Sequence, residues 1–199
     1  MKVNCDSEGI SQASNAIKEG STVVFPTDTV YGIGCDPFNK NSVNKIYEIK
    51  QRDKKKPFPV LTYSAEFASE IVEFDQVSKK IVEKFWPGPL TIILKLKEEK
   101  LRDSLGIQDK IAIRVPNNQC LLEILKNVKF LIGTSANLSG QSSFTKSQEC
   151  YQQVKGYDVF VDGGDTNNKG ESTILEIENG IPIIHRQGPI TKEEIEKYL

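Results

Sequence analysis

A polar segment that directly follows a short apolar run carries side chains suited to binding a small polar ligand. Residues 26–34 read PTDTVYGIG and come after the apolar run 23–25, which predicts a buried strand. Pro26 ends the ladder of that strand, so two threonines, an aspartate and a tyrosine follow where an open α/β sheet binds its ligands. In a plain turn, Thr and Asp would bond their own backbone instead. The segment predicts either contacts to hydroxyl, amine or carboxylate groups or an ordinary turn.

A cationic cluster occupies residues 50–56, which read KQRDKKK. Five of these seven residues are Lys or Arg, and they follow a predicted helix over 42–50, whose dipole a solvated cationic end would suit. Phosphate is the alternative partner, because Arg binds its oxygens through a fork and Lys as a point charge. A nucleic-acid patch is a third interpretation, although no interleaved aromatic residues support base stacking.

A second polar loop follows the predicted strand 130–132. Residues 133–140 read GTSANLSG and combine hydroxyls, an amide and small residues, which allow a ligand to approach closely. The same composition also suits an ordinary loop. Ser135 lacks the Gly-x-Ser-x-Gly surroundings of a nucleophile elbow, and a Ser-His-Asp site would have to use His185, the one histidine of the chain.

Three further charged or titratable residues lie on predicted strands. Arg114 falls within the apolar stretch 111–116, IAIRVP, where an unpaired charge is costly, so it predicts a site or a buried ion pair. His185, at the end of the apolar run 181–185, is interpreted as a packing residue rather than a catalyst. Arg186 follows it and is a surface residue unless a ligand binds there.

The composition is that of a soluble globular protein. Of the 199 residues, 38% are hydrophobic and 27% are charged, and the formal net charge is −1. The overall charge therefore favours neither nucleic acid nor an anionic membrane as a partner. The longest apolar runs are strand-sized and the first residues lack a signal-peptide core, which predicts no membrane segment and no secretion signal.

The cysteines and glycines exclude several standard sites. Four cysteines are scattered without a CxxC pair, and with one histidine they argue against a zinc site. We expect free thiols in a reducing cytoplasm. The Gly32-x-Gly34 pair lacks the third glycine of a Rossmann fingerprint, and a P-loop is absent. A bound nucleotide would therefore use neither standard loop.

Helical and strand patterns alternate along the chain. Helices are predicted at 10–18, 42–50, 75–85, from a cap at Asn117 to 126, and after the capping box 191–194. Strands are predicted at 22–25, 58–62, 90–96, 111–115, 130–132 and 159–161, and a hairpin at 172–185 around Asn179-Gly180. This alternation predicts a mixed α/β sheet with helices on its faces and no clear domain boundary. Residues 165–170 are the best candidate for a mobile loop.

Seven sequence blocks, taken in order, resemble the YrdC-like family of threonylcarbamoyl-AMP synthases. The blocks are PTDTVYG at 26–32, KxR at 50–52, WPGPLT at 86–91, IRVP at 113–116, TSANxSG at 134–140, STI at 172–174 and RxG at 186–188. The resemblance implies a twisted, mixed open α/β sheet with flanking helices around a deep basic cleft. It also implies one catalytic domain over residues 1–199, the short form of a family in which some members carry an extra C-terminal domain.

The activity that the resemblance implies is a nucleotidyl transfer. L-Threonine, bicarbonate and ATP, with Mg²⁺ on the phosphates, would give threonylcarbamoyl-AMP and pyrophosphate in the cytoplasm. Partner proteins would then pass the threonylcarbamoyl group to the tRNA adenosine next to the anticodon, and tRNA itself is a candidate ligand. Such a reaction needs positioning and cationic stabilisation rather than a protein nucleophile or a histidine base, which suits a chain with one histidine.

The resemblance also implies a role for each matching residue. Lys50 and Arg52 would be catalytic, holding phosphates and the developing carboxy-anhydride. The residues expected on the threonine and bicarbonate side are Thr29, Tyr31, Arg114, Ser135 and Ser172. The residues expected on the ATP side are Arg52, Lys56, Asn137, Thr145 and Arg186.

Two departures from the family pattern leave parts of this assignment open. Asp53 stands where the family commonly has Pro, and it would either weaken phosphate binding or help to hold Mg²⁺. Gln187 replaces a common Pro, and the loop 53–56, which carries Lys56, also differs from typical members.

Two other functions remain in view. A non-catalytic RNA-binding protein could use the same basic cleft, and would show salt-dependent binding without ATP turnover. A carbamoyl-adenylate-forming domain of the hydrogenase-maturation type would use carbamoyl phosphate in place of threonine. Such a domain normally sits in a much larger chain with zinc-finger and acylphosphatase-like segments, which this sequence does not contain.

Overall fold

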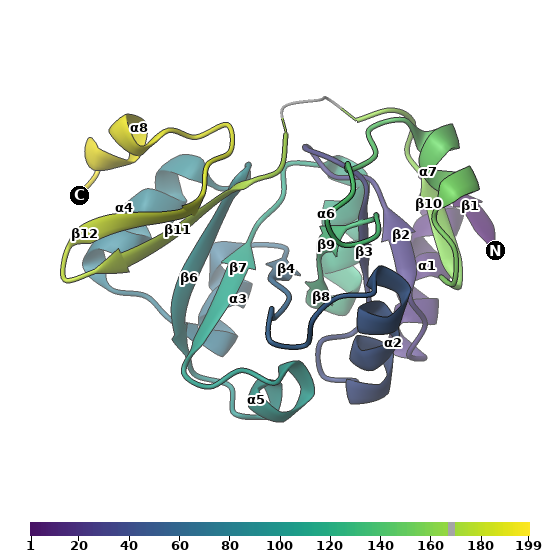
Figure 1. Ribbon diagram of the computed structural model, residues 1–199, viewed down its shortest axis with the longest axis horizontal. Coiled ribbons are helices and arrows are strands. Elements are labelled where there is room, and N and C mark those ends of the chain that lie inside the picture. Colours follow the sequence, from purple (N-terminus) through teal and green to yellow (C-terminus); the bar gives the residue numbers. More distant parts are fainter. Residues whose placement is uncertain (167–169) are drawn as a thin grey trace.

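Two mixed β-sheets carry the fold in the computed structural model, which describes residues 1–166 and 170–199 (Figure 1). The first sheet has the order β1-β10-β2-β3-β9. Its strands are β1 (Lys2–Asn4), β2 (Val23–Phe25), β3 (Gly32–Gly34), β9 (Thr134–Ser135) and β10 (Val159–Asp162). Strands β1, β10 and β2 run parallel, and β3 is antiparallel to both β2 and β9.

The second sheet has the order β12-β11-β6-β7-β4-β8, and β5 pairs with β6 outside this path. Its strands are β4 (Val60–Thr62), β5 (Val72–Glu73), β6 (Leu90–Leu96), β7 (Lys110–Arg114), β8 (Phe130–Ile132), β11 (Thr173–Glu178) and β12 (Ile181–Arg186). The pairs β11–β6 and β4–β7 are parallel, and the other pairs are antiparallel. The predicted mixed α/β fold is therefore confirmed, with two sheets in place of one.

The two sheets meet where β3 ends beside β8. The Ile132 amide donates to the Cys35 carbonyl at 2.9 Å, so the backbones lie in direct contact at this point. A Cβ at Gly34 would lie 1.7 Å from the Ile132 carbonyl oxygen, which no side chain can tolerate. Glycine at this position therefore allows the sheets to approach closely, and it holds the segment after β2 close to the loop after β8.

Helices flank both sheets. They are α1 (Ser7–Lys18), α2 (Lys40–Lys50), α3 (Ala65–Ile71), α4 (Gln76–Phe85), α5 (Lys100–Leu105), α6 (Gln119–Val128), α7 (Ser147–Gln153) and α8 (Lys192–Glu196). Six of these eight helices in the described ranges begin after a side chain that accepts a hydrogen bond from the first helical turn. These caps are Asp6, Asn39, Ser64, Asp75, Asn118 and Thr191.

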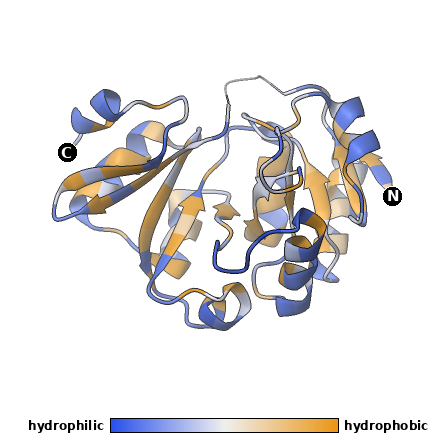
Figure 2. Cartoon of the chain, in the orientation of Figure 1, coloured by the Kyte–Doolittle hydropathy of each residue, from blue (hydrophilic) through white to orange (hydrophobic). Residues whose placement is uncertain are grey.

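The apolar residues form two buried clusters. The larger one includes the buried faces of β6, β7 and β8 and of helices α2 and α4. The smaller one joins α1 and α6 to strands β1, β2 and β10. Figure 2 shows hydrophobic strands in the interior and hydrophilic outer helix faces. Burial of these apolar side chains stabilises the framework that positions the site.

The sequence patterns place most long elements correctly and miss the shortest ones. The hairpin is confirmed, with left-handed φ values of 52° at Asn179 and 78° at Gly180, and so is the capping box at Thr191. The cap of α6 is Asn118 rather than the predicted Asn117. Strands β1, β3, β5 and β9 and helices α3, α5 and α7 lack a predicted counterpart. Residues 167–169 of the mobile loop predicted at 165–170 lie outside the described residues.

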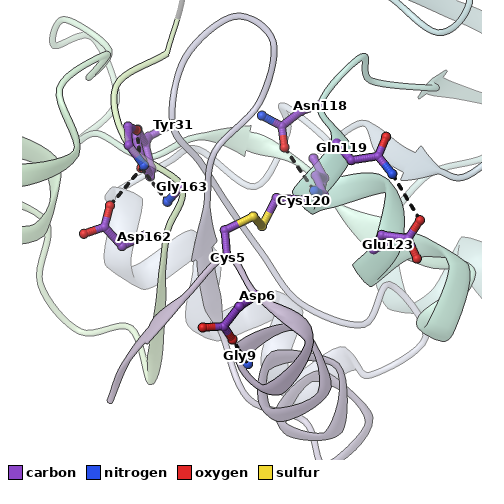
Figure 3. The surroundings of a disulfide bond; sticks show 12 residues. Cys5, Asp6, Gly9, Tyr31, Asn118, Gln119, Cys120, Glu123, Asp162 and Gly163 are labelled. Carbon is purple, nitrogen blue, oxygen red and sulfur yellow. Dashed lines mark hydrogen bonds between the residues drawn. A yellow bond between two sulfur atoms is a disulfide. The ribbon is translucent and has the colours of Figure 1, made fainter.

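The prediction that all four cysteines are free thiols is wrong. A disulfide joins Cys5, after β1, to Cys120 in the first turn of α6 (Figure 3). Cys35 and Cys150 are free and buried. The bonded cysteines are 115 positions apart in the sequence. The packing of α1 against α6 brings them together, so their spacing could not reveal the disulfide. The cysteines therefore lend no support to the predicted reducing cytoplasm.

Among residues 1–166 and 170–199, no helix has both the length and the apolar character needed to cross a membrane.

Candidate active site

A cavity of about 940 Å³ lies between residues of both sheets and contains most of the predicted site residues. Nine of the eleven predicted residues line it, namely Thr29, Lys50, Arg52, Lys56, Arg114, Ser135, Asn137, Ser172 and Arg186. They come from the segment after β2, the end of α2 and its following loop, β7, β9 and its following loop, and the β11–β12 hairpin. Segments far apart in the sequence thus converge on one cavity of a size suited to a small-molecule ligand.

The segment 26–31 is both a turn and a wall of this cavity. The Thr27 hydroxyl donates to the Val30 carbonyl at 2.7 Å and accepts from the Thr29 amide at 3.0 Å. These bonds confirm the turn interpretation. The same turn holds the Thr29 hydroxyl and the Asp28 carboxylate toward Arg114, so its side chains also contribute to the cavity. The two interpretations of this segment are therefore compatible.

Arg114 forms the buried ion pair that its apolar strand predicts. Its Nη2 donates to Asp28 Oδ1 at 2.5 Å, and its Nε donates to the Gly88 carbonyl at 2.9 Å. The side chains of Arg114 and Asp28 are 7% and 12% exposed. Burial lowers the pKa of the Arg114 guanidinium, and Asp28 opposes that effect. Since arginine stays protonated in proteins, Arg114 presents a fixed positive charge to the cavity.

Lys50 ends α2 and is almost completely buried, with 2% of its surface exposed. Its Nζ donates to the Ser135 carbonyl at 2.5 Å, and to the carbonyl and Oδ1 of Asn137 at 2.7 and 3.1 Å. The Lys50 carbonyl in turn accepts from the Ser139 amide at 2.9 Å. The three ammonium protons thus meet protein acceptors, and in this geometry Lys50 holds the 135–139 loop in place.

The rate of a reaction in this cavity should fall as pH rises through about 8. Burial, and then the charge of Arg52, lower the pKa of Lys50 to about 8, while Glu171 opposes them. Deprotonation removes a donor and loosens the loop that carries Ser135 and Asn137. In the unfolded chain, Lys50 keeps its proton up to the ordinary lysine pKa. Between about pH 8 and that pKa the unfolded state therefore binds more protons than the folded state, and the Lys50 contribution to the free energy of unfolding rises with pH. A pH–rate profile from 6 to 10 measures the effect, and a flat profile would contradict it.

Arg52 holds the basic loop that follows α2. Its Nε donates to the Lys56 carbonyl at 2.9 Å, its Nη2 donates to the Pro57 carbonyl at 3.3 Å, and its guanidinium lies 5.1 Å from the Phe58 ring centroid. Burial of the guanidinium is the largest effect on the pKa of Arg52, and it lowers that pKa. The loop between α2 and β4 is strongly hydrophilic in Figure 2, and its Lys55 and Lys56 line the cavity.

Ser172 and Arg186 contact each other at the open end of the hairpin, where β11 begins and β12 ends. Arg186 Nε donates to the Ser172 carbonyl at 2.9 Å and Nη2 donates to the Ser172 hydroxyl at 3.0 Å. The Ser172 hydroxyl also lies 2.8 Å from that of Thr91 on β6. A Cβ at Gly188 would lie 2.4 Å from the Glu171 carbonyl oxygen and from the Thr173 amide nitrogen. The glycine of the RxG block therefore lets the chain pass closely over residues 171–173.

Among the described residues, Tyr31 and Thr145 are predicted site residues that do not line the cavity. The Tyr31 side chain is 0% exposed, its ring stacks 5.5 Å from that of Phe160, and its hydroxyl donates to the Gly164 carbonyl at 2.7 Å. Figure 3 shows it beside Gly163. Its backbone bonds Phe144 and Ala136, so Tyr31 supports the loop after β9. Thr145 accepts at its carbonyl from the Thr166 amide at 2.8 Å.

Two carboxylates of the site are not predicted, because the partners of each lie elsewhere in the sequence. Glu171, which lines the cavity, contacts Arg186 and Ser143, and Asp28 contacts the cavity residue Arg114. The available signal was a carboxylate inside the PTDTVYG block for Asp28 and next to the STI block for Glu171.

His185 also lines the cavity, whereas its strand predicts a packing residue. Its Nε2 lies 2.7 Å from Glu176 Oε2, and its side chain is 45% exposed.

Comparison with known proteins identifies one family. The Sua5/YciO/YrdC family model, described as "Telomere recombination", matches residues 15–188. A threonylcarbamoyl-AMP synthase from Bacillus subtilis is 37% identical over 192 residues, which cover 94% of this chain and 55% of that protein. The threonylcarbamoyl-AMP synthase of Klebsiella pneumoniae is 30% identical, and the match covers 94% of this chain and 100% of that protein.

Solved structures share the fold. Pyrococcus abyssi Sua5 complexed with L-threonine superposes with a TM-score of 0.93 at 31% identity, covering 100% of this chain and 61% of that one. Escherichia coli YciO superposes with a TM-score of 0.84 at 25% identity, covering 94% of each chain. The chain thus spans just over half the length of the B. subtilis and P. abyssi proteins that it matches.

Proposed function

The chain belongs to the Sua5/YciO/YrdC family, and from this premise we propose that it is a threonylcarbamoyl-AMP synthase. Such an enzyme is a nucleotidyltransferase that converts L-threonine, bicarbonate and ATP into threonylcarbamoyl-AMP and pyrophosphate. The observation that carries the proposal is the cavity itself, in which hydroxyls and arginines from six segments converge. Support also comes from the P. abyssi Sua5 structure, which has this fold and contains L-threonine.

The chemistry requires cations and positioning more than a protein base. The threonine amine and bicarbonate would form an N-carboxylate with loss of water. A carboxylate oxygen would then attack the α-phosphorus of ATP, and the bond to the β-phosphate oxygen would break to release pyrophosphate. Negative charge accumulates around the phosphorus in this step, so preorganised guanidinium groups would stabilise its transition state.

The cavity offers groups for each part of the substrates. Arg114 and the hydroxyl residues Thr29, Ser135 and Ser172 line the same cavity, and their groups suit the carboxylate and hydroxyl of threonine. Arg52 and Arg186 suit phosphate oxygens, and Lys56 lies on the loop beside them.

The Lys50 ammonium would act by ordering the loop of Ser135 and Asn137. Tyr31 and Thr145 would act through backbone contacts.

Mg²⁺ is part of the proposal as the ion that accompanies ATP. Residues 1–166 and 170–199 contain no group of three or more His, Cys, Asp or Glu able to hold a metal ion. Mg²⁺ is commonly held by substrate phosphates, waters and one or two carboxylates, and the cavity provides Asp53 and Glu171. These residues fit an ion brought in on the phosphates, where it would neutralise phosphate charge.

The wider role follows from the product. Threonylcarbamoyl-AMP is an activated acyl donor, and we propose that partner proteins transfer its threonylcarbamoyl group to the tRNA adenosine next to the anticodon. A cytoplasmic location and direct contact with tRNA belong to the same proposal.

Pyrophosphate release tests the function directly. We expect release from ATP that requires both L-threonine and bicarbonate, with carbamoyl phosphate unable to replace them. Release that is unchanged without threonine would overturn the proposal. Binding of tRNA, titrated with salt in the same preparation, separates the enzyme from an RNA-binding protein, since the latter would bind tightly without turnover.

A further inference from the structure

Glu171 places a carboxylate in the middle of a strongly cationic cavity. Among the described residues that line the cavity, six are Lys or Arg, and the carboxylates are those of Glu171 and Asp53. Asp53 lies in the exposed basic loop and accepts from the Lys55 amide at 2.9 Å. Glu171 is half-buried at the start of the hairpin, and so it faces the cations more directly.

Both oxygens of Glu171 are bound by groups that also suit phosphate. Its Oε2 accepts from Arg186 Nη1, and its Oε1 accepts from the Ser143 hydroxyl at 2.8 Å. Because Nε and Nη2 of Arg186 donate to Ser172, the groups that face Glu171 are the guanidinium Nη1 and one hydroxyl, and both can donate to phosphate oxygens. Burial raises the pKa of the Glu171 carboxyl, but Arg186, Ser143, Ser135 and Lys50 outweigh it and hold that pKa below its ordinary value. Glu171 is therefore an anion in this position.

We propose that Arg186, which lines the cavity, and Ser143, which bonds Glu171 beside it, form an anion subsite, and that the Glu171 carboxylate competes with a phosphate group for it. The inference rests on the proposed function in so far as ATP would supply the phosphate. The chemistry it requires is simply an oxyanion with at least two acceptor oxygens.

The two ion pairs of the site differ in a way that makes Glu171 the displaceable anion. Asp28 and Arg114 are 12% and 7% exposed, so their ion pair is largely shielded from water. Glu171 and Arg186 are 32% and 39% exposed, so water can solvate the carboxylate once it leaves. Arg186 would stay in place, because its bonds to the carbonyl and hydroxyl of Ser172 do not involve Glu171.

Displacement would also strengthen the subsite for the incoming ligand. A polyphosphate carries more charge than a carboxylate, and it would meet Arg52 and Arg186, which repel each other at present. Glu171 thus keeps the cations ordered and weakens the binding of any single anion to them.

Glu171→Gln tests the competition, because it keeps the shape and removes the charge. The probe is inorganic pyrophosphate, titrated calorimetrically without threonine or bicarbonate. We expect the dissociation constant to fall on the order of tenfold, the scale of one charged hydrogen bond. Adding Ser143→Ala to Glu171→Gln should reverse much of the gain. Glu178→Gln is the matched control, since it removes the same charge from the same hairpin at a residue that pairs with Lys110 and does not line the cavity, and it should change affinity little.

Several outcomes would overturn the subsite. They are pyrophosphate binding that is unchanged or weaker in Glu171→Gln, an equal gain in Glu178→Gln, and no effect of Ser143→Ala. Glu171→Ala serves as a second variant, checked by thermal unfolding, if Glu171→Gln folds poorly. Tighter pyrophosphate binding without threonine-dependent turnover in the unaltered protein would sustain the subsite and reject the synthase. Normal turnover with unchanged pyrophosphate binding in Glu171→Gln would do the reverse.

Discussion

Arg52→Ala is expected to lower kcat/KM for ATP by about 10²–10³-fold, the usual loss when one preorganised transition-state donor is removed. The Arg52 guanidinium lines the cavity and is held by the carbonyls of Lys56 and Pro57 and by the face of Phe58. It is therefore oriented before any substrate arrives. Pyrophosphate release at varied ATP concentration measures the loss, which should fall mainly on kcat if the interaction forms in the transition state.

Two variants separate charge, geometry and loop order at this position. Arg52→Lys keeps the charge and loses the planar fork, so we expect an intermediate rate. Lys54→Ala removes a charge from the same loop, but its Nζ bonds Asn44 Oδ1 at 2.9 Å and it does not line the cavity, so the rate should stay near normal. A near-normal rate in Arg52→Ala, with unchanged thermal unfolding, would show that phosphates are held elsewhere.

The sequence predicts those elements of the fold that have a recognisable local pattern of apolar and turn residues. Strand β6 is predicted at its observed bounds, and the β11–β12 hairpin follows from Asn179-Gly180, whose left-handed backbone suits a tight turn. Strands β3 and β9 span three and two residues, too few for a period to register. Their pairing places them in the first sheet, and the close contact of Gly34 with Ile132 joins that sheet to β8 of the second.

The site is predictable to the extent that its chemistry lies in local blocks. Hydroxyls and cations directly after strands point to the cavity, because strand ends gather at one place in an α/β fold. The partners of these groups are not local: Arg114 meets Asp28 across 86 positions and Arg186 meets Glu171 across 15. Tyr31 illustrates the limit, since its motif favours the cavity while its ring fills the space beside Phe160.

Arg114→Met is expected to destabilise the protein by about 3–5 kcal/mol, the usual cost of leaving a buried charge without its partner. Asp28 would keep its carboxylate at 12% exposure and lose the Nη2 donor at 2.5 Å. The Gly88 carbonyl would also lose the Nε donor. Urea unfolding measures the change as a shift in midpoint at constant slope.

The stability effect and the functional effect of Arg114 can be separated by removing both charges of the pair. In Asp28→Asn with Arg114→Met no buried charge remains, so much of the lost stability should return, and the double-mutant cycle should show strong coupling. Activity should not return, because the cavity still lacks the guanidinium expected to bind the threonine carboxylate, and the KM for threonine should rise or turnover should vanish. A double variant as unstable as Arg114→Met would show that Asp28 is not the group left uncompensated. A stable double variant with a normal KM for threonine would instead assign Arg114 to the framework of the cavity, leaving the amino acid to be held by the surrounding hydroxyls.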